Sequence, residues 1–403
     1  METRFIHSSW PAAVLMIAAA APAQAQDGGV RVNDGETTLT IRGLVSTSFL
    51  INRSVFGGFG QGQNAEWAAR TPLSTDEIFT DGDVRSTRLR LDVAGAPAFG
   101  AWRPAAALEG DFFGGEGAPP FGDEQPRPRV RFAYVDLSNG RTTVRVGQMQ
   151  APLFGQAPVS VTHIAFPVGY GATGMIGWRG PGVFVYHDLA RGGPVQVQLQ
   201  FAALRGSGAV PAGSPDSTIE DGDAAGVPQI QGRLNLGGKT GAVTWTGYVV
   251  GHVDRKDMSG AGATMPNDEL TGWAIEGGGS VTRKPITLLG NYYTGRAVGQ
   301  HLAHITQIGD IRGWGAWAQL GYDLTSRWSA WAFYGIDDPD ERRFARTTGQ
   351  VLPRQRNQSM SGLLRFRAGR YAVGLEYFRA VTDWSGDGRS DADQVALSAL
   401  YTL

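Results

Sequence analysis

Arginine and carboxylate side chains alternate with apolar residues in the first third of the chain, and these arginines are well suited to bind an anion. The pattern comprises six arginines and two acids: Arg42, Arg88, Arg90, Arg129, Arg131, Arg145, Glu109 and Asp111. A guanidinium stays charged at physiological pH and offers forked donors to a carboxylate or a phosphate. On one shared face the arginines would line a path for anions. Paired with the acids across strands, they would instead hold a wall together, and the sequence leaves both interpretations open.

Other groups of reactive residues give weaker signals. Ser160 and His163 suggest a hydrolase, but the sequence has no Gly-x-Ser-x-Gly motif and no evident residue to orient the imidazole. His301 and His304 have the spacing of two metal ligands on a helix, yet they lie in a predicted loop. We therefore predict no catalytic residue, no metal site and no cofactor.

The elements that carry these side chains are predicted to be β-strands. Apolar and polar residues alternate with a period of two, most clearly at 195–201, where Val and Leu alternate with Gln before Phe201. At 127–137 the same alternation places Phe132 and Tyr134 with Val130 on the apolar face, opposite the arginines. About sixteen such segments run from 37–52 to 394–403, an even number as in bacterial outer-membrane barrels.

The connections between these segments alternate in length. Short turns such as 138–141 and 368–370 alternate with long Gly-, Pro- and Asp-rich loops, of which 150–182 is the third and 382–393 the last. Short turns on one rim and long loops on the other are typical of an all-β, antiparallel up-and-down barrel that crosses a membrane. We expect short periplasmic turns and long extracellular loops.

Composition and the N-terminus indicate an exported protein. The chain has 403 residues, a net charge of −1 and no cysteine, which argues against nucleic-acid binding and excludes disulfides and thiolate sites. A basic start, an apolar stretch and an Ala-x-Ala sequence predict a cleaved secretory signal at 1–25, followed by a barrel at 26–403. A barrel of this kind would contact outer-membrane lipid and, during biogenesis, the barrel-assembly machinery.

Two stretches of the chain are similar to a known family of porins. The sequence RVRFAYVDLSNG at 129–140, followed by RVGQMQAPLFG at 145–155, resembles a hairpin of trimeric DcaP-like (dicarboxylate) porins and of phosphate-selective O/P porins. DVRSTRLRL at 83–91 and LEGDF at 108–112 match the preceding strands, so the similarity covers about 83–188. The resemblance implies a sixteen-stranded barrel in a homotrimer, with the third long loop, 150–182, folded into the lumen. The final residue Leu403 departs from the Phe with which such porins end.

These observations predict a porin in the outer membrane of a Gram-negative cell. It would be a passive diffusion channel for small hydrophilic solutes, with a preference for anions set by arginines that face the lumen. One alternative is a channel specific for dicarboxylates or phosphate, which needs several arginines that converge on one site. The alternatives from other classes are a barrel enzyme and a plugged structural or adhesive barrel.

Overall fold

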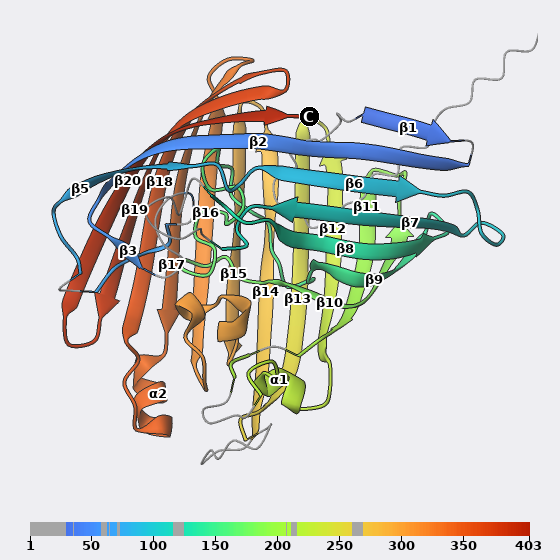
Figure 1. Ribbon diagram of the computed structural model, residues 1–403. Coiled ribbons are helices and arrows are strands. Elements are labelled where there is room, and N and C mark those ends of the chain that lie inside the picture. Colours follow the sequence, from blue (N-terminus) through green and yellow to red (C-terminus); the bar gives the residue numbers. More distant parts are fainter. Residues whose placement is uncertain are drawn as a thin grey trace, which may run out of the picture.

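The computed structural model describes residues 30–403 except for 35, 58–62, 64, 71–72, 116–124, 207, 211–215 and 260–268. The predicted secretory signal at 1–25 lies outside these residues. No helix in the described part of the chain is long and apolar enough to span a membrane. The fold is a closed antiparallel β-barrel (Figure 1).

One sheet of 18 strands forms the barrel, and two of these, β1 and β5, are short additions beside β2. The sixteen remaining strands pair in sequence order, and β20 pairs with β2 to close the ring. They are β2 (Thr37–Arg53), β6 (Arg88–Ala94), β7 (Arg103–Asp111), β8 (Arg129–Ser138), β9 (Thr142–Gln150), β10 (Arg179–Ala190), β11 (Val195–Leu204), β12 (Gln229–Thr240), β13 (Val243–Asp257), β14 (Glu269–Arg283), β15 (Ile286–Arg296), β16 (Arg312–Asp323), β17 (Trp328–Pro339), β18 (Arg354–Ala368), β19 (Tyr371–Trp384) and β20 (Gly388–Thr402). The predicted fold class and strand number are confirmed.

Strand β2 is the longest element and carries two partners along one edge. Its first half pairs with β6 and its second half with β5 (Ile78–Asp83), so β5 and β6 together occupy one strand position. β1 (Val30–Asp34) pairs with the start of β2, beyond the end of β20. Because both edges of the long strand are paired, the ring of sixteen strands closes at β2.

The period-two pattern separates an outer from an inner face. On β2, Phe49 is 55% exposed while its neighbour Leu50 is fully buried. Successive side chains in a strand point to opposite faces. The same alternation recurs along β13, where Val249 is exposed and Val250 is buried. Apolar side chains therefore cover the outside of the barrel, as a wall in contact with lipid requires.

A β-bulge on β8 changes the predicted facing of two aromatic residues. Glu109 pairs with Phe132 and Gly110 pairs with Val130, which leaves Arg131 as an extra residue. A bulge of this kind shifts the alternation by one residue. Phe132 and Tyr134 are consequently buried on the inner side, and their predicted place on the apolar outer face is wrong.

The two rims of the barrel differ in the way that was predicted. Short turns such as 139–141, 241–242 and 369–370 join strands at one rim, and long connections join them at the other. The last connection was predicted as a long loop at 382–393, and this is wrong: β19 runs to Trp384 and β20 begins at Gly388. Ion pairs such as Arg389 to Asp383 at 2.8 Å join these polar ends across the hairpin.

The long connections contain the other small elements. These are the hairpin β3 (Phe56–Gly57) and β4 (Trp67–Ala68), the helices α1 (Asp221–Ala224) and α2 (Glu341–Thr348), and the 3₁₀ turns η3 (Gly299–His301) and η4 (His304–Thr306). The largest hydrophobic core lies inside the barrel, between residues 151–178 and the inner wall. There Phe166, Tyr170 and Met175 pack with Trp317 of β16 and Phe333 of β17.

Candidate pore constriction

The third long connection folds into the barrel, as predicted, and the wall opposite the arginines holds it. This connection, residues 151–178 between β9 and β10, is named the inner loop below (Figure 1). Its backbone is held by amide side chains of three strands. The N–H of Val159 donates to Gln319 Oε1 at 2.6 Å, and Asn291 and Asn357 donate to carbonyls of the inner loop at 3.0 and 3.1 Å. A backbone segment buried in a barrel needs such partners, because unpaired polar groups are costly.

A carboxylate and a glycine fix the inner loop further. Ser160 Oγ donates to Glu376 Oε2 of β19 at 2.7 Å. Gly174 has a φ of +92° and lies so close to β16 that an added Cβ would be 2.4 Å from the carbonyl carbon of Ala316. Only glycine fits this left-handed conformation and this approach without displacement. The inner loop is therefore fixed against the wall at its tip.

Two arginines and two acids of the predicted set form a buried network on β7 and β8. Asp111 accepts from Arg129 Nη2 at 2.7 Å and from Arg131 Nη1 at 2.9 Å, and Glu109 accepts from Arg131 Nε at 2.8 Å. Asp111 and Arg131 are almost completely buried. This arrangement matches the second interpretation of the pattern, in which the charges hold the wall together.

Three further arginines of the predicted set extend this network along the wall. Arg90 donates to Asp92 and, at 2.9 Å, to the hydroxyl of Tyr134. Arg145 forms a forked pair with Asp136, with both distances at 2.7 Å, and its guanidinium lies 3.6 Å from the centre of the Tyr134 ring. Arg42 lies 3.3 Å from Asp92. Tyr134 thus takes part in the inner charge network, which its predicted outward position did not anticipate.

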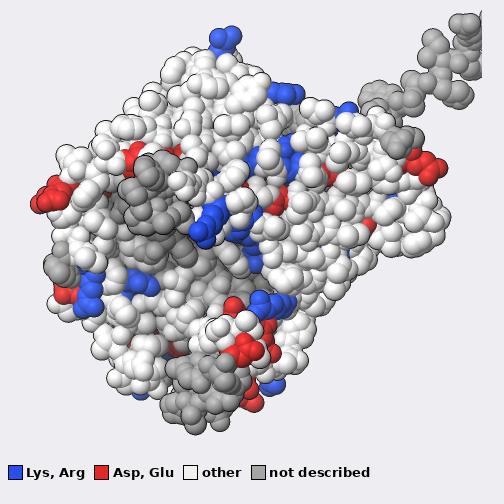
Figure 2. All heavy atoms as spheres, in the orientation of Figure 1, with Lys and Arg blue, Asp and Glu red and all other residues white. Residues whose placement is uncertain are grey.

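Arg88 differs from the other five arginines. Its Nη2 donates to the carbonyl of Ile164 in the inner loop at 2.5 Å, and no described carboxylate pairs with it. The six arginines are thus offset by four carboxylates, those of Asp92, Glu109, Asp111 and Asp136. Two positive charges are left on this wall. Figure 2 shows basic and acidic side chains gathered together in the middle of the face in view.

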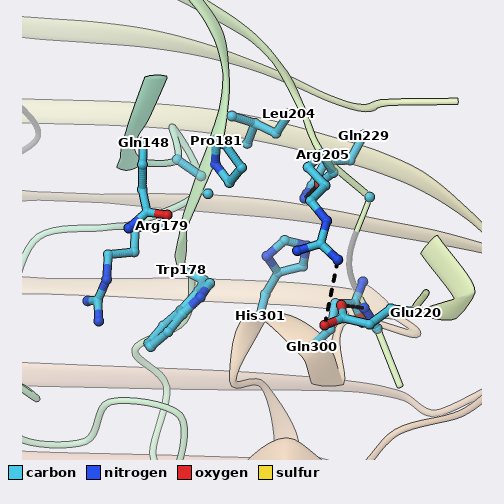
Figure 3. Close-up of a pocket in the computed structure, with 14 residues that line it drawn as sticks. Gln148, Trp178, Arg179, Pro181, Leu204, Arg205, Glu220, Gln229, Gln300 and His301 are labelled. Carbon is cyan, nitrogen blue, oxygen red and sulfur yellow. Dashed lines mark hydrogen bonds and ion pairs between the residues drawn. The ribbon is translucent and has the colours of Figure 1, made fainter. Parts of the chain in front are cut away.

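A pocket at the long-loop rim contains residues that the sequence analysis did not select. It has a volume of about 270 Å³ and lies where β9 and β11 end and β10 and β12 begin. Figure 3 shows Trp178 and Arg179 on one side and Arg205, Gln300 and His301 on the other. The guanidinium of Arg179 lies over the Trp178 ring, 4.4 Å from its centre, and Arg179 has no ion pair with a described residue. Arg179 directly follows the inner loop in the sequence, and this position is the signal from which it could have been selected.

The residues considered for other chemistry do not assemble as a nucleophile and its base. Ser160 Oγ bonds to Glu376, while His163 contributes only its backbone N–H to Ser160, at 2.7 Å. Burial lowers the pKa of the His163 imidazole. His304 Nδ1 lies 2.6 Å from Asp337, so His301 and His304 do not face a shared ligand.

Comparisons with known proteins agree with this geometry. No family model and no curated protein matches the chain. Among solved structures it is similar to the outer membrane channel DcaP of Acinetobacter baumannii, with 17% identity and a TM-score of 0.69 over 93% of this chain and 100% of that one. It is also similar to an anion-selective porin from Comamonas acidovorans, with 12% identity and a TM-score of 0.55 over 91% and 100% of the two chains.

A third similar structure is OprB of Pseudomonas putida, with 10% identity and a TM-score of 0.54 over 90% and 94% of the two chains. These similar structures include an outer-membrane channel and a porin, and at these identities the similarity is one of fold. The present chain has this outer-membrane porin fold.

Proposed function

We propose that this protein is an outer-membrane porin, a passive diffusion channel for small hydrophilic solutes that prefers anions. The observation that carries the proposal is the inner surface of the closed barrel, where six arginines face four carboxylates and the inner loop narrows the lumen. A narrow passage with low-dielectric walls strengthens the field of the remaining positive charge. The anion-selective porin from Comamonas acidovorans, which shares the fold, supports this assignment.

The pocket beside Arg179 favours a second candidate, a channel specific for a small dicarboxylate or phosphate. Arg179 and Arg205 both line this pocket, although Arg205 also bonds to Asp223. A guanidinium without a carboxylate partner is free to donate a forked pair of hydrogen bonds to an anionic solute. A saturable site of this kind would slow transport at high solute concentration, which simple diffusion would not.

The remaining features of the proposal concern the setting of the channel. We propose that it lies in the outer membrane with its apolar outer face in lipid, is inserted by the barrel-assembly machinery, and acts without a catalytic step. We also propose that the protein forms a homotrimer, because one similar structure, OmpT of Vibrio cholerae, has a trimer form. That structure is 12% identical to this chain, with a TM-score of 0.52.

Planar-bilayer recording of the refolded protein in a KCl gradient tests the proposal. An open current whose reversal potential shows chloride selectivity is the expected result. Replacement of Arg88 and Arg179 by glutamine should lower this selectivity, because these two arginines lack a described carboxylate partner. Folded barrels without conductance would contradict the channel function, and a cation-selective current would contradict the role of the arginines. Block by succinate or phosphate at low concentration would favour the specific channel.

A further inference from the structure

Three side chains that could bind a metal ion come together from elements far apart in the sequence, and one of them, His301, lines the pocket in Figure 3. His252 and Asp254 lie two residues apart on the inner face of β13, and His301 belongs to η3 in the connection after β15. One ligand atom from each lies within 4.8 Å of the other two. We propose that His252, Asp254 and His301 bind a divalent transition-metal ion of the Zn²⁺ type.

The geometry of the three groups suits a shared ion better than direct hydrogen bonds. His252 Nε2 lies 3.6 Å from Asp254 Oδ1, too far for a hydrogen bond. Two tetrahedral ligands at about 2.0–2.1 Å from zinc lie about 3.4 Å apart, which is close to this spacing. The rings of His252 and His301 meet edge to face with their centres 4.5 Å apart, so both can point at one ion.

The ligand atoms also lack other partners. His252 Nε2, Asp254 Oδ1 and both ring nitrogens of His301 are buried without a hydrogen bond to a described residue. Leaving such polar atoms unpaired is costly, so their clustering at one point indicates that something else satisfies them. His301 lines the pocket and gives an ion a route to the cluster.

The Oδ2 atom of Asp254 already accepts hydrogen bonds, which leaves Oδ1 free for an ion. Lys256 Nζ and Gln300 Nε2 each donate to Asp254 Oδ2 at 2.6 Å. Asp221 of α1, a second buried carboxylate, interacts electrostatically with Asp254 and Lys256. Two carboxylates against one ammonium leave one negative charge, which a cation would offset. The ligand set, two imidazoles and one carboxylate with an open position, suits zinc.

Gln231 lies behind His252 and controls which ring nitrogen carries the proton. Its Nε2 lies 3.2 Å from His252 Nδ1, and its Oε1 accepts from the N–H of Leu153 at 2.8 Å. Coordination through Nε2 places the proton on Nδ1, where a carboxylate oxygen would accept it better than the amide group does. A glutamate at this position would accept from both Leu153 and His252. Gln231→Glu should therefore strengthen metal binding, unlike a change that removes a ligand.

A bound ion would join the connection after β15 to the wall at β13. It would hold His301 and Gln300 in place on one side of the pocket, opposite Arg179. This inference does not rest on the proposed channel function, because metal binding is measured without transport.

The test uses the full chain, refolded, stripped with EDTA and titrated with ZnSO₄ by calorimetry, with the bound metal counted by mass spectrometry. We expect about one zinc ion per chain. His252→Gln and His301→Gln should each weaken binding at least tenfold, and Gln231→Glu should strengthen it about tenfold. The matched control is His187→Gln, because His187 lies on β10 outside the cluster and should leave binding unchanged.

Heat-dependent mobility of the barrel on a gel shows that each variant has folded, and Asp254→Asn supplies a third ligand variant should one of the histidine variants fail. The absence of stoichiometric zinc binding would overturn the proposal. So would binding that the ligand variants leave unchanged, or binding that His187→Gln weakens to the same degree.

Discussion

The two sides of the barrel wall carry different kinds of side chain on their inner faces. Strands β6–β9 carry arginines, most of which are paired with carboxylates, whereas β15–β20 present amides, hydroxyls and aromatic rings to the inner loop. Glu376 is the acid that anchors the loop on the second side, through Ser160. The comparison teaches that buried charge in this barrel is placed according to what faces it.

The physical reason lies in how each group satisfies a neighbour. A neutral amide bonds to a loop backbone without leaving a charge behind, so the inner loop can lie dry against the wall. Charged pairs on the other side keep their field in the open part of the lumen. Apart from Arg88 and Arg233, which donate to carbonyls of the inner loop, the side chains that attach the loop are separate from the charged pairs, which the following changes test.

The largest effect is expected from detaching the inner loop. Gly174→Val would place side-chain atoms against the backbone of Ala316, and the loop would have to move off β16. We expect a conductance roughly threefold higher or more, because the diameter of the constriction limits the current. Single-channel recording checks this. Gly362→Val is the control, since a Cβ at Gly362 meets open space. An unchanged conductance in folded Gly174→Val channels would show that the loop does not set the constriction.

Neutralising one acid on each side sharpens the comparison. Asp111→Asn removes the partner that Arg129 and Arg131 share, so anion selectivity should rise. One unit charge about 6 Å from a passing anion in water contributes about 0.7 kcal/mol, or about a threefold change in permeability ratio. Glu376→Gln removes an equal charge beneath the inner loop and should leave selectivity nearly unchanged. Equal shifts in reversal potential for the two variants would disprove the division between the sides.

A smaller effect is expected at the pocket on the long-loop rim. Arg179→Gln removes a guanidinium that has no ion pair with a described residue. At about 10 Å from the path, one charge is worth about 0.4 kcal/mol, so anion permeability should fall about twofold. Arg191→Gln is the control, because Arg191 is exposed in a turn on the opposite rim. If both variants behave alike, the pocket makes no contribution to selection.

The smallest effect is expected from pH. Guanidinium groups keep their charge across the physiological range. The reversal potential in a KCl gradient should therefore be the same at pH 6 and pH 8. A large shift over this range would mean that histidine side chains, and not the arginine wall, set the selectivity.

The sequence by itself determined the architecture of this protein. Period-two alternation and the difference between short and long connections predicted the closed barrel, because both follow from the local chain and from the lipid outside, and the resemblance to porins implied the lumenal loop. Strand ends were predicted less well, because polar residues beyond the apolar zone still pair across strands although the apolar pattern has stopped. For this reason β13 continues to Asp257 and β18 begins as early as Arg354.

The tertiary structure alone decided which side chains meet. A one-residue bulge on β8 turned Phe132 and Tyr134 inward, and register placed Arg129 and Arg131 on Asp111. The folding of distant connections into the lumen brought His301 to His252 and left Arg179 at the pocket without an ion-pair partner among the described residues. Such contacts depend on the register and on the path of loops, which a local pattern does not encode because each joins residues far apart in the chain.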